Sequence, residues 1–325
     1  MKKVIPMLFI AASLHAQTAT PRDTTDPYRW LEEVNGERAV TWVKAENAKT
    51  TAVLEADPRY ADIYREAFRM ASAKDRIPYP TFIGGELYNF WQDSAHKRGI
   101  WRKTSLGSYR SKDPVWVTVL DLDTLAAHEK ANWVWHGASC ALPAERRCLL
   151  RLSDGGEDAV TIREFDLPSR AFVANGFSLP KGKQNVSWAG EDTLLVAREW
   201  KPGELTASGY PYITKRLARG QPLDAAVEIY RGDPKDVSVS AFTMTDGKGH
   251  RVSMIGRGIS FFESESFIVR PNDVARLNVP KKFEIQDLFD GQIIARLTQD
   301  WTAAGRTYKS GSVVSFDAAA ATKSS

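Results

Sequence analysis

The sequence predicts a mainly β protein built from repeated units and preceded by an N-terminal helical segment. Apolar, aromatic-rich segments recur at Trp135, Trp188, Val239 and Leu288, at steps of 53, 51 and 49 residues. Each of these segments is followed by a polar turn and a second apolar strand. A repeat of about 50 residues with several short strands in each unit is typical of a β-propeller. We therefore expect a partial β-propeller of about five four-stranded blades.

Residues 1–16 are predicted to be a signal peptide. Lys2 and Lys3 precede an apolar stretch from Val4 to Leu14, and Ala16 supplies a small residue at the cleavage position. The apolar stretch is too short to cross a bilayer. A buried N-terminal strand is the alternative, but it leaves the two lysines unexplained. The expected location is therefore periplasmic or secreted, with no membrane partner.

Residues 17–76 are predicted to be a polar leader followed by a helical segment. One helix is expected to begin at position 35 or 36. A second is expected after Asp57 as its N-cap, with Pro58 at the first helical position, where a missing N–H costs nothing. The apolar residues of this second helix share one face: Tyr60, Ile63, Tyr64, Ala67 and Phe68. Pro78 and Pro80 end the helical pattern.

Residues 77–325 are predicted to form the partial propeller, because the pattern changes to period two from about Thr81. Segments 87–92 and 99–104 are expected to pair around a polar turn, and segments 115–122 and 159–167 to form further strands. Turns such as Asp154-Gly155-Gly156 mark the corners of the blades. We expect most tryptophans in this region to pack between blades rather than to line a substrate site.

Cys140 and Cys148 are the only cysteines of the chain, and they flank a predicted hairpin loop. In an oxidising compartment this pair can close a small disulfide loop. Two buried strand thiols are the alternative, since cysteine is among the most buried residue types. Sequence does not decide between them, because a disulfide has strict geometric requirements.

No catalytic, cofactor-binding or metal-ligating constellation is recognisable in the residues themselves. The chain has no Gly-x-Ser-x-Gly motif, and the histidines at 96, 128, 136 and 250 lack a metal-ligand spacing. His136 and Ser139 are close in sequence, but residues three apart on one strand point to opposite faces. Without Lys2 and Lys3 the chain carries 42 basic and 40 acidic residues, which predicts no nucleic-acid partner. No cofactor is expected.

Several segments resemble the prolyl oligopeptidase family, in particular its bacterial exported serine peptidases. The segments that resemble its N-terminal helical part are Asp26-Pro27-Tyr28-Arg29-Trp30-Leu31-Glu32-Glu33 and Trp42-Val43-Lys44-Ala45-Glu46-Asn47. Residues 88–93 and 98–102 resemble its first blade, and residues 132–137 and 261–265 resemble later blades. The similarity runs from about Asp26 to Phe316, and each motif is specific only in combination with the others.

The resemblance implies a serine-type endopeptidase that cleaves short peptides after proline. In this family a seven-bladed propeller limits access to a Ser-His-Asp triad on an α/β-hydrolase domain. The sequence stops at Ser325, before the positions of the family's triad, so no catalytic residue is carried over to it. We expect the gating part of such a peptidase, inactive alone, whose partners are the hydrolase domain and, in the full-length context, short proline-containing peptides. The alternative is a free-standing exported propeller that binds peptides or proteins.

Overall fold

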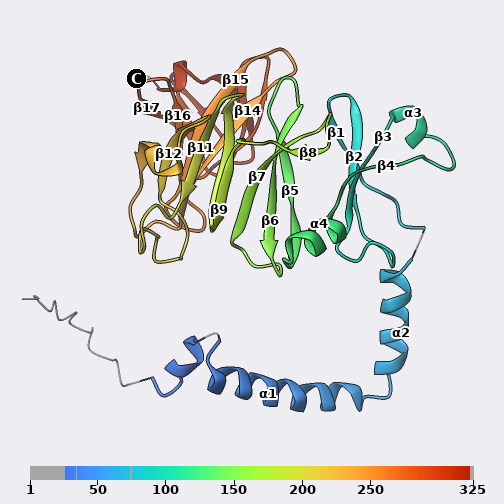
Figure 1. Ribbon diagram of the computed structural model, residues 1–325. Coiled ribbons are helices and arrows are strands. Elements are labelled where there is room, and N and C mark those ends of the chain that lie inside the picture. Colours follow the sequence, from blue (N-terminus) through green and yellow to red (C-terminus); the bar gives the residue numbers. More distant parts are fainter. Residues whose placement is uncertain (1–25, 34, 74, 323–325) are drawn as a thin grey trace, which may run out of the picture. The chain divides into compact units, whose positions relative to one another are not determined.

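The computed structural model describes residues 26–322 apart from residues 34 and 74. The described chain forms two compact units, the first ending at Ala73 and the second comprising the rest (Figure 1). The sequence placed this boundary after residue 76. The predicted signal peptide and the polar leader, residues 17–25, lie outside the described residues.

The first unit is helical, with η1 (Arg29–Glu32), α1 (Glu37–Glu55) and α2 (Tyr60–Ala71). α1 follows Gly36, as the sequence predicts. α2 begins two residues later than expected, because the Asp57 carboxylate accepts the backbone N–H of Arg59 at 2.9 Å and also binds the Arg59 guanidinium. These bonds use Asp57 in a turn before the helix. The apolar stripe of α2 forms as expected, and Tyr64 stacks between Tyr60 and Phe68.

The second unit is built from antiparallel sheets whose strands follow one another in chain order. The first sheet contains β1 (Thr81–Ile83), β2 (Glu86–Trp91), β3 (Ile100–Thr104) and β4 (Val117–Asp121). The second contains β5 (Trp133–Cys140), β6 (Arg147–Asp154), β7 (Val160–Asp166), β8 (Ala171–Phe172) and β9 (Ser178–Gly182). The third contains β10 (Gln184–Gly190), β11 (Thr193–Arg198), β12 (Ile213–Ala218) and β13 (Val227–Arg231).

The fourth sheet contains β14 (Ser238–Thr245), β15 (Arg251–Gly258), β16 (Ser264–Val269) and β17 (Val274–Arg276). The fifth contains β18 (Phe283–Phe289), β19 (Gln292–Leu297) and β22 (Val313–Asp317), with the hairpin β20 (Trp301–Ala303) and β21 (Arg306–Tyr308) between the last two. Short helices α3 (Leu106–Tyr109), α4 (Leu122–Glu129) and η2 (Leu223–Ala225) lie in the connections, and η3 (Ala320–Thr322) follows β22.

The expectation of about five blade-like sheets is confirmed, with two departures from four strands each. The repeated segments at Trp135, Trp188, Val239 and Leu288 lie in β5, β10, β14 and β18, the first strands of four sheets. In the second sheet, β8 pairs with one end of β7 and β9 with the other, so two short strands share one edge. In the fifth described sheet, β19 pairs directly with β22.

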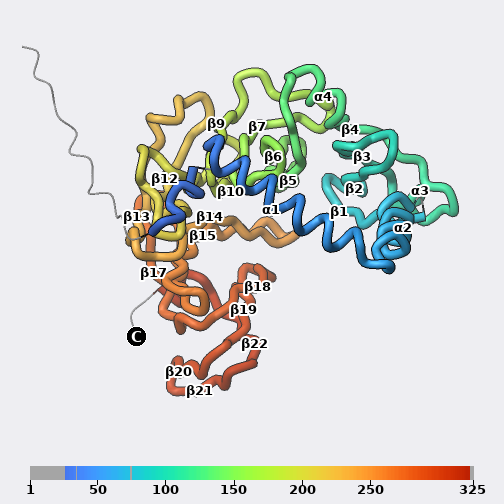
Figure 2. The backbone as a smooth tube through the Cα atoms, turned by 90° about the horizontal axis from the view of Figure 1, so that it is seen from below, coloured from blue at the N-terminus to red at the C-terminus, as the bar shows by residue number. Residues whose placement is uncertain are grey.

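The apolar cores lie between neighbouring sheets, and Figure 2 shows the sheets of the second unit following one another along an arc. Trp101, Leu150 and Phe165 belong to the core between the first and second sheets. Trp188 and Leu194 belong to the core between the second and third. Because a buried large apolar side chain stabilises a fold by ~2 kcal/mol, these layers hold the sheets in order. Trp101 and Trp188 thus pack between sheets, as the sequence suggested.

Candidate functional site

The turns that join the first and second strands of successive sheets lie side by side in the second unit. We call these turns, residues 84–85, 141–147, 189–192, 246–250 and 290–291, the hairpin rim. The Gly84 N–H donates to the Glu145 carboxylate at 2.6 Å, which joins the first two turns. The Arg251 guanidinium donates to the carbonyls of Leu142 at 2.6 Å and Ala189 at 3.3 Å. One side chain of the fourth sheet therefore joins the turns of the second and third.

Asp246 joins the last two turns of the hairpin rim. Its carboxylate accepts the His250 ring Nδ1 at 2.7 Å and the Gly291 N–H at 3.0 Å. Burial by itself would raise the pKa of Asp246, but these hydrogen bonds hold that pKa well below its ordinary range. A carboxylate that stays charged keeps the two turns bonded over the whole physiological pH range.

Cys140 and Cys148 lie at the base of the largest turn in the rim. They face each other in the register of β5 and β6, and their sulfur atoms are joined as a disulfide in the structure. Cys148 is fully buried. The bridge closes the loop of residues 141–147, which is also held by the contacts of Leu142 and Glu145 described above and by the Arg146 carbonyl, which accepts the Leu167 N–H at 2.8 Å.

Three hollows adjoin this loop. A hollow of about 560 Å³ lies between the second and third sheets and is lined by Ala141, Ala144, Arg146, Arg147, Asp166, Glu191, Asp192 and Arg219. One of about 300 Å³ lies between the first and second sheets and is lined by Ile83, Gly84, Glu86, Tyr88, Lys103, Ala144, Glu145, Arg146, Leu167, Pro168 and Arg170. A third, of about 120 Å³, is lined by residues of the first strands and their turns.

The largest of these three hollows lies beside a buried ion pair. The side chain of Glu164 is wholly buried, and Arg219 donates to its two oxygens at 2.8 and 3.0 Å. Phe177 adds a backbone N–H at 2.7 Å. The bond to Glu164, ahead of a second one to Asp192, raises the pKa of Arg219. Because the Glu164 carboxylate and the Arg219 guanidinium neutralise each other, this ion pair holds the second and third sheets together and offers no free reactive group.

The smallest of the three hollows has hydroxyl residues from three sheets in its lining, Ser139, Ser187, Thr243 and Thr245, beside Arg251. The Ser139 hydroxyl is buried and has no hydrogen-bond partner in the structure. The Ser139 carbonyl accepts the indole N–H of Trp188 at 2.9 Å. Sequence reasoning had no signal for this hollow, because its members come from turns and strands about 50 residues apart.

His136 does not pair with Ser139, in agreement with the strand argument. Its Nε2 lies 2.8 Å from the Ser153 hydroxyl on the neighbouring strand. Ser153 is 1% exposed, so its hydroxyl is not open to a substrate, although His136 itself is exposed. A serine nucleophile needs an adjacent base and access to the reacting carbonyl. The pair therefore supports packing of β5 on β6.

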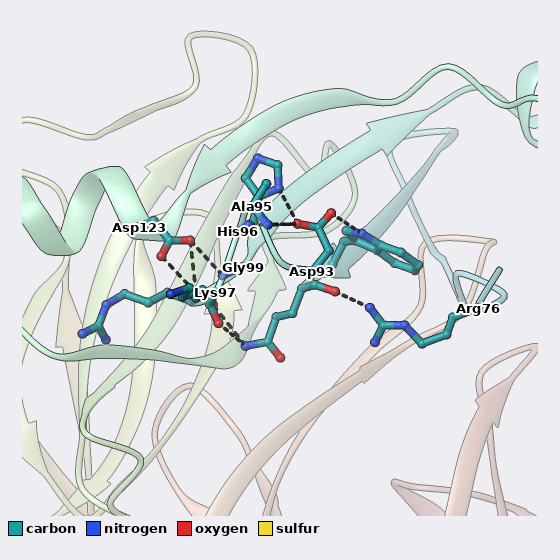
Figure 3. A network of polar contacts seen from close by, with 10 residues as sticks. Arg76, Asp93, Ala95, His96, Lys97, Gly99 and Asp123 are labelled. Atoms are coloured by element: carbon teal, nitrogen blue, oxygen red, sulfur yellow. Dashed lines mark hydrogen bonds and ion pairs between the residues drawn. The ribbon is translucent and has the colours of Figure 1, made fainter. Parts of the chain in front are cut away.

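A separate polar network holds the turn after β2 (Figure 3). Asp93 accepts the backbone N–H groups of Ala95 and His96 at 2.9 Å, the His96 ring at 3.0 Å and the Trp91 indole at 3.0 Å. These bonds, first of all the His96 N–H, lower the pKa of Asp93 to about 2. Asp123 binds the end of the same turn through the N–H groups of residues 98 and 99. The network is a structural support of the first sheet.

Neither a metal centre nor a membrane helix is present in the described part of the chain. Residues 26–322, without 34 and 74, contain no group of three or more His, Cys, Asp or Glu side chains placed to hold a metal ion. Over the same residues, no helix has both the length and the apolar character needed to cross a bilayer.

Comparison with known proteins gives the same family from sequence and from structure. The family model described as the N-terminal β-propeller domain of prolyl oligopeptidase matches residues 11–323. An uncharacterized peptidase of Sinorhizobium fredii is 44% identical over 92% of this chain, which corresponds to 42% of the relative. An uncharacterized peptidase of Rickettsia prowazekii is 27% identical, over 43% of its own length. The chain thus spans less than half the length of these relatives.

Two solved structures place the fold. A post-proline cleaving enzyme from Rickettsia typhi superposes with a TM-score of 0.84 at 27% identity, over 91% of this chain and 45% of that one. Oligopeptidase B from Leishmania major superposes with a TM-score of 0.60 at 16% identity, over 86% of this chain and 38% of that one. At that identity the second likeness concerns the fold alone.

Proposed function

The chain belongs to the prolyl oligopeptidase family through its N-terminal β-propeller domain, and we propose that it is the gating part of a serine peptidase that cleaves short peptides after proline. The observation that carries this proposal is the likeness to the Rickettsia typhi post-proline cleaving enzyme over 91% of this chain. In this proposal the propeller selects substrates by their size, because a ring of packed sheets excludes folded proteins from a catalytic serine and admits short peptides.

The catalytic serine, histidine and aspartate belong, in this proposal, to a hydrolase region outside these residues. We therefore expect the purified 325-residue chain to leave a proline-linked chromogenic peptide uncleaved and to remain unlabelled by a serine-directed fluorophosphonate. Hydrolysis that copurifies with the chain and is abolished by the fluorophosphonate would overturn this part of the proposal.

A chimera tests the gating role directly. Replacing the matched part of the Rickettsia typhi enzyme by this chain should give a protein that is labelled by the fluorophosphonate and cleaves a short proline peptide. The same chimera should leave an unfolded, proline-containing protein of about 100 residues intact, because the propeller limits substrate size. A labelled chimera that cleaves both substrates at similar rates would exclude gating by this propeller. A folded, unlabelled chimera would favour the alternative of a free-standing binding module.

We also propose that residues 1–16 direct export and are removed. Lys2, Lys3 and the apolar stretch that follows them support this, and the disulfide suits an oxidising compartment. Expression in a bacterium with fractionation and N-terminal sequencing checks it. The expected product is periplasmic or extracellular and begins at Gln17, whereas a cytoplasmic product that retains Lys2 would refute export.

A further inference from the structure

The hollow of about 300 Å³ between the first and second sheets has more positive than negative charge. It is lined by Lys103, Arg146 and Arg170 and by only two carboxylates, Glu86 and Glu145. Both carboxylates are already engaged: Glu86 pairs with Lys103, and Glu145 accepts the Gly84 N–H. The charges of the two arginines are left without a carboxylate partner in this hollow.

Arg146 is the freer of the two arginines. Its side chain is exposed and makes no hydrogen bond or ion pair with any residue of the described chain. Its charge does act on Asp166, where it adds to the lowering of that pKa by hydrogen bonds from Ser169. The Arg170 guanidinium donates one N–H to the Thr118 carbonyl at 3.2 Å, which leaves most of its donors available.

The phenol of Tyr88 supplies a further donor from the floor of the hollow. Tyr88 is 5% exposed and lines the hollow, yet its hydroxyl bonds to nothing in the described residues. Burial raises the pKa of Tyr88 to about 12, with a contribution from the charge of Glu86, while Arg170 acts in the opposite direction. A phenol hydroxyl that faces a hollow and has no protein partner can donate a hydrogen bond to a ligand bound there.

The rest of the hollow is apolar. Ile83, Leu167 and Pro168 line it, and the first two are nearly buried. Two guanidinium groups and a phenol beside an apolar surface suit an anion with an apolar body, and guanidinium matches the planar, two-oxygen shape of a carboxylate.

We propose that this hollow binds a carboxylate group attached to a small apolar residue, carried either by the C-terminus of a short peptide or by a small organic acid. Arg146 and Arg170 would hold the two oxygens, Tyr88 would donate to one of them, and Ile83 and Leu167 would contact the apolar part. The site does not depend on the proposed peptidase function, because it is formed by the second unit itself.

Calorimetric titration of the full chain at pH 7 tests the site. The probes are Ala-Ala-Leu with a free C-terminal carboxylate, the same peptide as its C-terminal amide, and isovalerate. The free-acid peptide is expected to bind at least tenfold more tightly than the amide, since a charge-assisted bond is lost in the amide. Tight binding of isovalerate would assign the site to small organic acids in general, and its failure to compete would assign it to peptide ends. Equal binding of acid and amide would overturn the proposal.

Variants distinguish binding in this hollow from a nonspecific effect of the protein's positive charge. Arg146→Gln should weaken binding of the free-acid peptide about tenfold, and Tyr88→Phe should weaken it about threefold while preserving the packing of the ring. Arg110→Gln is the matched control, because Arg110 is exposed, has no side-chain partner in the described chain and lies outside every hollow at this rim. Equal losses in Arg146→Gln and Arg110→Gln would refute the assignment. Far-UV circular dichroism verifies that each variant is folded.

Discussion

Single polar side chains at turns hold this molecule together, and Asp93 shows how. Its carboxylate accepts bonds from two backbone N–H groups, a ring nitrogen and an indole, all within 3.0 Å. Asp93 and Trp91 were visible in the sequence as part of a turn and a strand. Their pairing was not, because it depends on how the turn folds back over the strand end.

Replacing Asp93 with asparagine tests the charge of this network. The pKa of Asp93 in the folded chain, about 2, is lower than the ordinary value of 3.8. Since the folded value is depressed, the carboxylate contributes stability above pH 3.8, and that contribution disappears as the pH falls through about 2. We expect Asp93→Asn to lower the free energy of unfolding by about 1 kcal/mol at pH 7. Urea unfolding followed by tryptophan fluorescence at pH 7, 5, 3 and 2 measures this difference.

The difference between Asp93→Asn and the natural chain should shrink between pH 4 and pH 2. Asp113→Asn is the control, because Asp113 is exposed and its side chain makes no hydrogen bond or ion pair within the described chain. It should change stability by less than about 0.5 kcal/mol at every pH. A deficit of Asp93→Asn that is the same at pH 7 and pH 2 would show that shape, not charge, matters at this turn.

At the scale of elements, the hairpin of β5 and β6 depends on its disulfide. The bridge between Cys140 and Cys148 closes the loop of residues 141–147. A cross-link that closes so short a loop is worth about 2 kcal/mol by removing conformations of the unfolded chain. We expect Cys140→Ala/Cys148→Ala to lose about that amount in urea unfolding.

The reduced natural chain is the matched comparison for this double variant. A dithiol reductant should lower the stability of the natural chain to the level of Cys140→Ala/Cys148→Ala and leave the variant unchanged. Mass spectrometry after thiol alkylation counts free thiols in the chain as purified, with none expected. Two alkylated thiols together with full stability would mean that the cysteines are buried thiols.

Strands were easier to predict than helices and edges in the second unit. Period-two patterns and Gly turns located the first two strands of each repeat, because these signals are local. The sequence predicts one strand over residues 115–122, but α4 begins at Leu122, where Asp121 accepts the Thr124 N–H at 3.0 Å as an N-cap. An aspartate before Leu122 and Ala126, which are both buried, was the signal that could have found this helix.

At the scale of the whole molecule, the repeat predicted the architecture and the contacts along the rim stayed hidden. The repeated apolar segments are spaced by 53, 51 and 49 residues, because each sheet is one repeat unit and buries its apolar faces against the neighbouring units. The rim contacts join residues far apart in the chain, as when Arg251 binds the Leu142 carbonyl. Such long-range pairs produce no repeating pattern in the sequence, so the hollows beside loop 141–147 could not be predicted from it.

The exposed apolar face of α2 makes association the expected behaviour of this chain. Ile63, Tyr64 and Phe68 are 64%, 58% and 62% exposed. An apolar patch of this kind tends to be covered by another surface.

We expect sedimentation velocity to show a sedimentation coefficient that rises with concentration. The variant Ile63→Lys/Phe68→Lys should abolish that rise, since charge on the stripe opposes its burial. Asp62→Lys lies on the opposite side of the helix by its spacing and should still associate. If the natural chain is monodisperse and monomeric over a hundredfold range of concentration, this face does not drive association; if both variants abolish the rise equally, net charge and not the stripe controls it.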